Sequence, residues 1–370
     1  MILQDKNFGF LMTRGISLVK WDKIGILERE IRPYQKLAEY FNKVYLFTYG
    51  NFDDKSYSNL FPINVEIVTK RAVFPALIYS FLLPFINRKK MKDIQIIKTN
   101  QMDGSWSAVI SKKFYGTKLI VRCGYEWLQT IKKAKKSNIK KLIAYYIEKF
   151  AYSNADNIIL TSEDSRKFVI RKFNICPEKI QIIPNYVDVN YFKPSSVDKE
   201  KNRIIFVGRL EKEKNLFNLL SSLEGLDVRL VLIGSGSLRR DLEKIAKEKR
   251  IDAVFKGNTP QSAIPEELNK SQIFILPSFY EGNPKVLLEA MSCGLACIGS
   301  DVEGINSIIT DGEDGILSLT DPNSLRTSIV RLIENKELCA KLGINARKKI
   351  EAQNSFSVLV EKELSVYESI

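Results

Sequence analysis

The chain has 370 residues, of which 45% are hydrophobic and 27% charged, the composition of an ordinary globular protein with two or three domains. It contains no histidine, which excludes histidine-based triads, and its five cysteines include no Cys-x-x-Cys pair, which argues against structural zinc and disulfide frameworks. The net charge of +14 is uneven: residues 1–150 hold 27 Lys/Arg and 12 Asp/Glu, whereas residues 151–370 hold 30 and 31.

The first half alternates short apolar runs with helical stretches, which predicts a parallel sheet with crossover helices. A helix is predicted over 23–41, with Asp22 as its N-cap. The apolar stretch 73–86 is shorter than the roughly 18 residues of a membrane span. It fits either an ordinary buried helix or a membrane-facing segment. The predicted strands are 8–12, 44–48, 65–68, 94–98, 119–122, 158–161 and 180–183.

A dense run of lysines follows, directly before an apolar stretch that begins at Leu142. Three interpretations are open: a solvated helix face, a contact with an anionic membrane surface, and a nucleic-acid site. No nucleic-acid-binding signature accompanies the charge, so the last is the least favoured. The lysines of the run are Lys132, Lys133, Lys135, Lys136, Lys140 and Lys141.

The second half begins near 184–201, a polar segment with two prolines that predicts a domain boundary. Strands are predicted at 204–207, 229–233, 253–255, 273–276 and 296–298, and helices at 237–249 and 284–292. The final helix, 355–369, is acidic and is expected to cross back to the basic first domain. We therefore expect domains at 1–190 and 191–354 and a C-terminal helix at 355–370.

A glycine and two basic residues follow the predicted strand 204–207. Gly208 would let the backbone approach a ligand closely. Arg209 and Lys214 carry donors that suit a diphosphate, although both could be solvated surface cations. A Gly-Ser-Gly-Ser turn at 234–237 fits a phosphate site or a plain tight turn, because the third glycine of a dinucleotide fingerprint is missing.

Two glutamates and a proline follow the predicted strand 273–276. Pro284 suits the first turn of a helix, whose N-terminus favours an anion. Glu281 could accept bonds from sugar hydroxyls or compensate the helix dipole. Glu289 could accept bonds from a ribose or be a buried, satisfied carboxylate. The backbone N–H groups that would face the anion belong to Asn283, Lys285 and Val286.

The order, spacing and strand context of these motifs resemble the retaining glycosyltransferases of family 4, of the group 1 type found in bacterial surface-polysaccharide synthesis. The resemblance is strongest over 184–315 and begins at Pro184-Asn185. It implies an α/β GT-B fold, in which two Rossmann-like, doubly wound parallel-sheet domains face a central cleft. Residues 1–190 would bind the acceptor, and 191–354 would bind the nucleotide-sugar donor.

The resemblance also implies roles for individual residues. Arg209 and Lys214 would stabilise charge on the leaving diphosphate, and Glu281 would orient the sugar, which makes these three the catalytic candidates. Glu289 would hold the ribose. The other donor-binding residues implied are Gly25, Gly208, Asn258, Asn283, Pro284, Lys285 and Val286.

One position departs from the family. Many members have a histidine before the glycine that is Gly124 in this chain, and Cys123 occupies that place. A neutral thiol is a poor substitute for an imidazole. The candidates for positioning the acceptor or sugar are Asp103, Arg122, Cys123 and Glu126.

The function implied is retaining transfer of a sugar, from a UDP-sugar or alternatively a GDP-sugar, to a glycan or lipid-linked acceptor in cell-surface polysaccharide or lipopolysaccharide synthesis. No Asp-x-Asp motif occurs, so neither a metal nor another cofactor is expected. We expect a cytoplasmic protein whose basic first domain contacts the inner-membrane surface loosely, with no nucleic-acid partner. The alternative is a non-catalytic nucleotide-sugar-binding or scaffold protein of the same fold.

Overall fold

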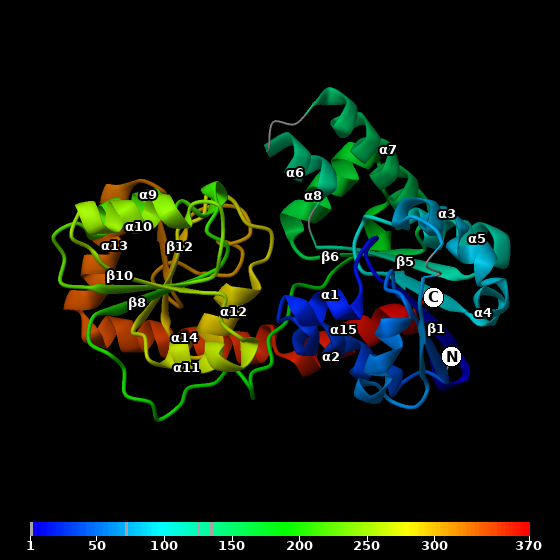
Figure 1. Cartoon of the computed structure of the whole chain (residues 1–370), viewed down its shortest axis with the longest axis horizontal. Coiled ribbons are helices and arrows are strands. Elements are labelled where there is room, and N and C mark those ends of the chain that lie inside the picture. Colours follow the sequence, from blue (N-terminus) through cyan, green and yellow to red (C-terminus); the bar gives the residue numbers. More distant parts are fainter. Residues whose placement is uncertain (1–2, 71–72, 125, 134–136) are drawn as a thin grey trace. The chain divides into compact units, whose positions relative to one another are not determined.

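The computed structural model describes residues 3–70, 73–124, 126–133 and 137–370. The chain divides into two compact units, Met1–Ile183 with Val360–Ile370, and Pro184–Leu359 (Figure 1). Each unit is built on one sheet whose strands are all parallel. The expected pair of doubly wound parallel-sheet domains is therefore confirmed.

The sheet of the first unit has the order β3-β2-β1-β4-β5-β6-β7. Its strands are largely apolar runs, because helices cover both faces of the sheet and side chains on either face are buried. The order reverses between β1 and β4, which is where open α/β sheets bind ligands beyond the carboxyl ends of the strands. The strands are β1 Asn7–Leu11, β2 Lys43–Phe47, β3 Val65–Val68, β4 Ile96–Thr99, β5 Lys118–Cys123, β6 Asn157–Leu160 and β7 Ile180–Ile182.

The helices of the first unit cover both faces of this sheet, with α3, α5 and α7 in one layer and α1, α2 and the C-terminal helix α15 (Phe356–Glu368) in the other (Figure 1). They are α1 Leu18–Lys23, α2 Leu27–Ala38, α3 Ala76–Ile86, α4 Arg88–Asp93, α5 Trp106–Tyr115, α6 Trp127–Lys133, α7 Asn138–Asn154 and α8 Glu163–Phe173. Short 3-10 turns occupy Leu3–Asp5, Phe52–Leu60 and Pro177–Lys179.

The single helix predicted over 23–41 is wrong. Asp22 lies inside α1, and the N-cap of α2 is Ile26. Gly25 separates the two helices, with a φ of 72° that ordinary residues adopt only at a cost. The glycine therefore ends α1 in the way that glycine commonly ends helices.

The sheet of the second unit has the order β10-β9-β8-β11-β12-β13, and it reverses between β8 and β11. The strand β13 was not predicted, because it has only three residues. The strands are β8 Arg203–Val207, β9 Arg229–Ile233, β10 Asp252–Gly257, β11 Ile273–Leu276, β12 Ala296–Ser300 and β13 Ile316–Ser318.

Helices also cover both faces of the second sheet, with α9, α10 and α13 on one side and α11, α12 and α14 on the other (Figure 1). They are α9 Leu216–Leu223, α10 Arg239–Glu248, α11 Ile264–Asn269, α12 Lys285–Ser292, α13 Pro322–Glu334 and α14 Lys336–Gln353. The 3-10 turns η4 and η5 are Lys212–Lys214 and Gln261–Ala263.

The acidic helix α15, Phe356–Glu368, ends on the first unit. There the ammonium of Lys98, a β4 residue that is 3% exposed, lies 2.6 Å from the carboxylate of Glu363. The Tyr367 hydroxyl donates to the same carboxylate over 2.6 Å. Burial would raise the pKa of Glu363, but the charges of Lys98 and Arg122 and the bonds from Lys98 and Tyr367 together hold it below its usual value. A buried ion pair therefore fixes the end of the chain to the first sheet.

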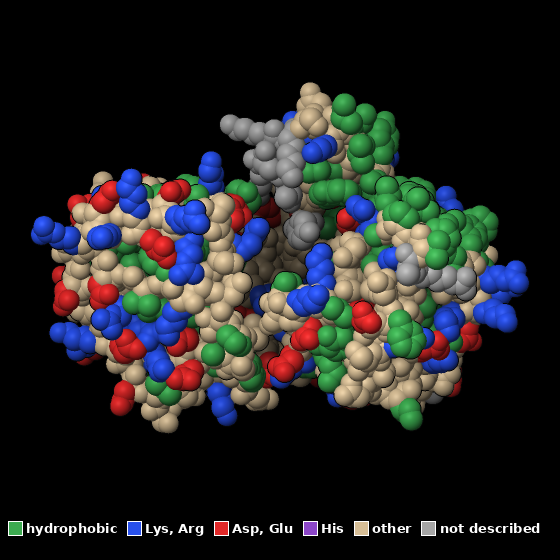
Figure 2. Space-filling model, viewed as in Figure 1, with side chains coloured by type: hydrophobic (Ala, Val, Ile, Leu, Met, Phe, Trp, Pro, Cys, Tyr) green, Lys and Arg blue, Asp and Glu red, His purple; other side chains and the backbone are tan. Residues whose placement is uncertain are grey.

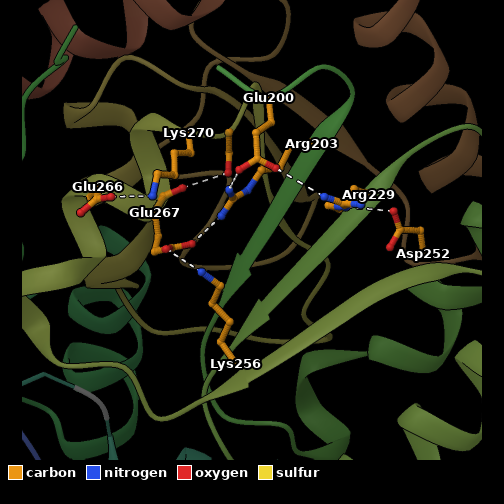
Figure 3. A network of polar contacts seen from close by, with 9 residues as sticks. Glu200, Arg203, Arg229, Asp252, Lys256, Glu266, Glu267 and Lys270 are labelled. Atoms are coloured by element: carbon orange, nitrogen blue, oxygen red, sulfur yellow. Dashed lines mark hydrogen bonds and ion pairs between the residues drawn. The ribbon is translucent and has the colours of Figure 1, made fainter. Parts of the chain in front are cut away.

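A second charged network lies at the amino ends of β8 and β9 (Figure 3). The buried Arg203, the first residue of β8, pairs with Glu200 and with Glu267 of α11. Lys256 lies 2.6 Å from Glu267, and Arg229 lies 2.9 Å from Asp252. Arg203, Arg229 and Asp252 are the first residues of their strands, whereas Lys256 reaches Glu267 from near the end of β10. Because the charges of the network neutralise one another, we assign it to stability.

Candidate functional site

Two glycine-containing loops join at the carboxyl ends of β8 and β9. The Gly208 N–H donates to the Ile233 carbonyl over 2.9 Å, and Leu210 N–H donates to the Ser235 carbonyl over 2.9 Å. A Cβ atom on Gly234 would lie 2.0 Å from the Gly208 carbonyl oxygen. Only glycine permits this approach, which fixes the backbone that carries the two candidate cations.

Lys214, the last residue of η4, lies beside Glu281 in the loop after β11. Its ammonium is 2.5 Å from Oε1 of Glu281, and the Ser278 hydroxyl donates to the same oxygen over 2.7 Å. The two side chains of the pair are 14% and 12% exposed. The structure thus brings together two of the three catalytic candidates, which are 67 residues apart in the chain.

Arg209, the third catalytic candidate, extends into solvent. Its side chain is 73% exposed, and its guanidinium lies 2.8 Å from the carboxylate of Glu213, four residues further along. Such an exposed pair contributes little to stability. The guanidinium is therefore accessible to a ligand at little cost.

Two residues that support this loop were missed as site residues. Gly304, after β12, has a φ of +86°, and a Cβ atom there would lie 2.1 Å from the Gly282 carbonyl oxygen. The buried Asn215 adopts a left-handed backbone, and its side-chain amide donates to the carbonyls of Pro277 and Thr320 over 3.0 and 2.7 Å. The available sequence signals were a glycine and an asparagine in the segments that follow β12 and β8.

Helix α12 begins next to Glu281 with Pro284 as its N-cap, so no N-cap side chain accepts a bond from its first N–H groups. The Asn185 N–H donates to Oδ1 of Asn283 over 2.9 Å, and the Asn185 side chain donates to the Asn283 carbonyl over 2.6 Å. The Pro184-Asn185 motif therefore holds the turn that presents the amino end of α12.

Glu289 is inside α12, where its side chain is 4% exposed. Gln261 of η5 approaches its carboxylate at 3.4 Å, so the segment after β10 lies next to this glutamate. Asn258, the first residue after β10, is exposed. The structure thus brings the segment that follows β10 against Glu289, for which a ribose contact remains a prediction.

The Gly-Ser-Gly-Ser turn at 234–237 already binds a carboxylate of the chain. The Ser237 N–H and hydroxyl donate to Glu211 over 2.8 and 2.7 Å. These bonds lower the pKa of Glu211. Helix α10 begins only at Arg239. The tight-turn interpretation therefore fits this segment better than a phosphate site.

In the first unit, Asp103 pairs with an arginine from the neighbouring loop. The Arg14 guanidinium donates to both carboxylate oxygens of Asp103, over 2.7 and 3.0 Å. This bidentate pair joins the loops after β1 and β4, the two strands between which the sheet order reverses. Its side chains are 29% and 30% exposed, so a ligand can contact them.

The other first-unit candidates lie at three places: the end of β5, the residue before α6, and the turn between α1 and α2. Cys123, at the end of β5, is fully buried in the hydrophobic core, which does not favour direct contact with a sugar. The Arg122 N–H donates to the Thr99 hydroxyl over 3.1 Å. Glu126 is buried, whereas Gly25 is exposed between α1 and α2.

Family models match both halves of the chain: one described as Glycosyltransferase Family 4 matches residues 35–191, and one described as Glycosyl transferases group 1 matches residues 188–349. Among curated relatives, the UDP-Gal:alpha-D-GlcNAc-diphosphoundecaprenol alpha-1,3-galactosyltransferase of Escherichia coli is 30% identical over 254 residues, which cover 61% of this chain and 64% of that protein. An uncharacterized glycosyltransferase of Methanocaldococcus jannaschii is 25% identical over 337 residues, 88% of this chain and 90% of that one. The match thus spans less than two thirds of the length of the Escherichia coli relative.

Solved structures share the fold over nearly the whole chain. Anabaena HepE in complex with UDP superposes with a TM-score of 0.80 at 17% identity, over 98% of this chain and 100% of that one. Sucrose-phosphate synthase from Thermosynechococcus elongatus gives 0.78 at 17%, over 98% of both chains. These similarities show the GT-B fold. Because the two family models together extend from residue 35 to residue 349, the chain belongs to the group 1 glycosyltransferases that carry a family 4 first domain.

Proposed function

We propose that the protein is a retaining glycosyltransferase that moves a sugar from a nucleotide diphosphate sugar to a hydroxyl of a lipid-linked or other glycan acceptor. The observation that carries the proposal is the Lys214–Glu281 contact of 2.5 Å, next to the amino end of α12. A UDP-sugar is the favoured donor, with a GDP-sugar as the alternative. The name of the Escherichia coli relative supports a UDP-sugar and a lipid-linked acceptor. The proposed pathway is cell-surface polysaccharide synthesis, as the family resemblance implies.

The second unit would hold the diphosphate between two cations and a helix end. Arg209 and Lys214 would donate charge-assisted hydrogen bonds to it, and the helix dipole of α12 would favour its negative charge. Lys214 is already positioned by Glu281, so it would need little rearrangement as charge grows on the leaving diphosphate. Glu281, Asn283 and the N–H groups of Lys285 and Val286 would contact the sugar and phosphate.

The transfer breaks the bond between the anomeric carbon and the diphosphate and forms a bond from that carbon to the acceptor oxygen on the same face. The acceptor proton leaves with the diphosphate or with solvent. Because Arg209 and Lys214 supply the positive charge, the proposed reaction requires no divalent metal. The first unit would hold the acceptor near the Arg14–Asp103 pair, on the cytoplasmic side of the inner membrane.

The test is binding and transfer with a panel of UDP-sugars and GDP-sugars in the presence of EDTA. A donor at 100 times its dissociation constant should raise the free energy of unfolding by about 2.7 kcal/mol. Arg209→Ala should weaken this stabilisation, whereas Arg331→Ala, which removes an exposed arginine of α13, should leave it intact. NMR of the product would report the anomeric configuration.

If no nucleotide sugar stabilises the protein, or if both arginine variants behave as wild type, the proposed donor site is wrong. Stabilisation without transfer to any lipid-linked or glycan acceptor would instead favour the non-catalytic binding protein.

A further inference from the structure

The exposed large hydrophobic side chains are concentrated on one layer of the first unit. Ten of the twenty in the described part of the chain lie on α3, α5 and α7. On α3 they are Leu77, Ile78, Phe81 and Phe85, spaced so that they follow one side of the helix. The opposite side of α3 buries Tyr79 and Leu83. The interpretation of 73–86 as an ordinary buried helix is therefore wrong, since only one side of it is buried.

Helix α7 repeats this arrangement. Its exposed hydrophobic side chains are Ile139, Leu142, Ile143, Tyr146 and Phe150, with spacings of three and four residues. This is the pattern of an amphipathic helix, but its apolar stripe faces outward. The side that faces the protein buries Ala144, Ala151, Tyr152 and Glu148. The Glu148 carboxylate accepts a bond from the Leu128 N–H of α6 over 3.3 Å.

Helix α5 connects the two stripes. Phe114 of α5 packs edge-on against Phe85 of α3, with ring centroids 5.0 Å apart. The ammonium of Lys113, also on α5, lies 5.1 Å from the ring centroid of Phe150 on α7. Figure 2 shows hydrophobic side chains gathered over these three helices. We call the ten side chains the apolar face.

The charges around the apolar face are positive. Helices α3, α5 and α7 carry five lysines, and their single acidic residue is the buried Glu148. Lys113, Lys140 and Lys149 are exposed. The side chains of residues 132–136 in the lysine run lie outside the described residues. None of the described helices is long and apolar enough to cross a bilayer.

We propose that the apolar face docks on the surface of an anionic lipid bilayer, with the side chains of α3 and α7 entering the interface. Outward aromatic and aliphatic stripes bordered by lysines are the composition of interfacial helices, which gain both apolar burial and attraction to anionic lipids. A second copy of this chain would bring lysines against lysines, so charge favours the bilayer as the occupant. The proposed function enters this inference only as the reason for docking, which would give the protein access to a lipid-linked acceptor.

The position of the apolar face within the first unit supports a role in access to the acceptor. Phe81 of the face stacks on Trp106, with ring centroids 5.4 Å apart. The Arg14 guanidinium lies 5.8 Å from the Trp106 ring centroid and pairs with Asp103. The face therefore reaches the sheet edge where we place the acceptor, so a glycan attached to a membrane lipid would have only a short distance to travel.

The test is co-sedimentation of the full chain with vesicles of phosphatidylglycerol and phosphatidylethanolamine, and with neutral phosphatidylcholine vesicles. The two variants are Ile78→Ser/Phe81→Ser on α3 and Leu142→Ser/Ile143→Ser on α7. The matched control, Phe52→Ser/Ile63→Ser, removes two exposed hydrophobic side chains of the same unit outside the face. Each face variant should lower the partition coefficient on anionic vesicles at least tenfold, and the control should change it less than threefold.

A second measurement reports how deeply the apolar face enters the bilayer. Phe81→Trp should show quenching by brominated lipids, whereas Phe52→Trp should not. Equal vesicle binding by face and control variants, or an unquenched Trp at 81, would overturn the inference. So would a dimer in analytical ultracentrifugation that the face variants abolish, combined with no vesicle binding. Donor-induced stabilisation of the same variants separates the two proposals, because it tests the nucleotide-sugar site without lipid.

Discussion

Replacement of Lys214 tests the proposed donor site most directly. Lys214→Met keeps the volume and flexibility of the side chain but removes the ammonium that lies 2.5 Å from Glu281. In the free protein, the carboxylate of Glu281 would retain the bond from Ser278 and lose its counter-charge. In the donor complex, the diphosphate would lose one charge-assisted hydrogen bond.

The expected losses of folding stability and of transition-state stabilisation differ in size. A mostly buried carboxylate that loses a partner costs about 1–3 kcal/mol of unfolding free energy. A donor aimed at developing charge contributes about 3–4 kcal/mol to the transition state, so kcat/KM should fall by roughly 10² to 10³. The double variant Lys214→Met/Glu281→Gln removes both charges. It should recover most of the stability and none of the activity.

The assay is donor consumption at saturating acceptor, with denaturant unfolding on the same preparations. Lys244→Met, which removes an exposed lysine of α10, is the control and should match wild type in both kcat/KM and unfolding free energy. If Lys214→Met lowered stability but kept kcat/KM within threefold of wild type, the ion pair would be structural only. The proposed role of Lys214 would then be refuted.

Three further predictions concern residues outside the ion pair. Burial raises the pKa of Glu363, but the charges of Lys98 and Arg122 and the hydrogen bonds from Lys98 and Tyr367 together lower it in the folded protein. The contribution of Glu363 to stability is therefore present above pH ~4.3 and is lost as the pH falls through the folded pKa. Glu363→Gln should lower the unfolding free energy by about 3 kcal/mol at pH 7, and less at pH 3, in denaturant titrations, whereas the exposed Glu361→Gln should not. Gly304→Ala should weaken donor binding at least tenfold in calorimetry, because its Cβ would collide with the loop that carries Glu281. Gly312→Ala, with a similar positive φ but open space around it, is the control, and equal effects of the two substitutions would contradict the reasoning. Asp103→Asn should raise the acceptor KM about tenfold and leave the donor dissociation constant unchanged, and a shift in the donor constant would show that this carboxylate acts elsewhere.

Much of the fold could be predicted because strands buried on both faces read as continuous apolar runs. The predicted bounds of β3, β9 and β11 agree with the structure residue for residue. The failures have local causes. The three-residue β13 is too short to show a pattern. The predicted helix over 23–41 includes Gly25, whose positive φ separates α1 from α2.

The candidate site was predictable to the level of residue type and strand end. Arg209 and Lys214 follow β8, and Glu281 follows β11, and the carboxyl ends of parallel strands meet at one edge of the sheet. The supporting residues were not predictable. Gly304 and Asn215 act through close backbone approach and through bonds to carbonyls distant in sequence, which no local pattern records.

The alternation of strands and helices, the charge imbalance and the cations and carboxylates after particular strands could be predicted, because they depend on local composition and spacing. The pairing of Lys214 with Glu281, the bonds from Asn185 to Asn283 and the burial of Cys123 arise from packing between distant segments. The same packing turns the apolar stripes of α3 and α7 outward. An apolar run has the same composition whether its neighbours cover it or not, and only packing decides which of its sides meets solvent.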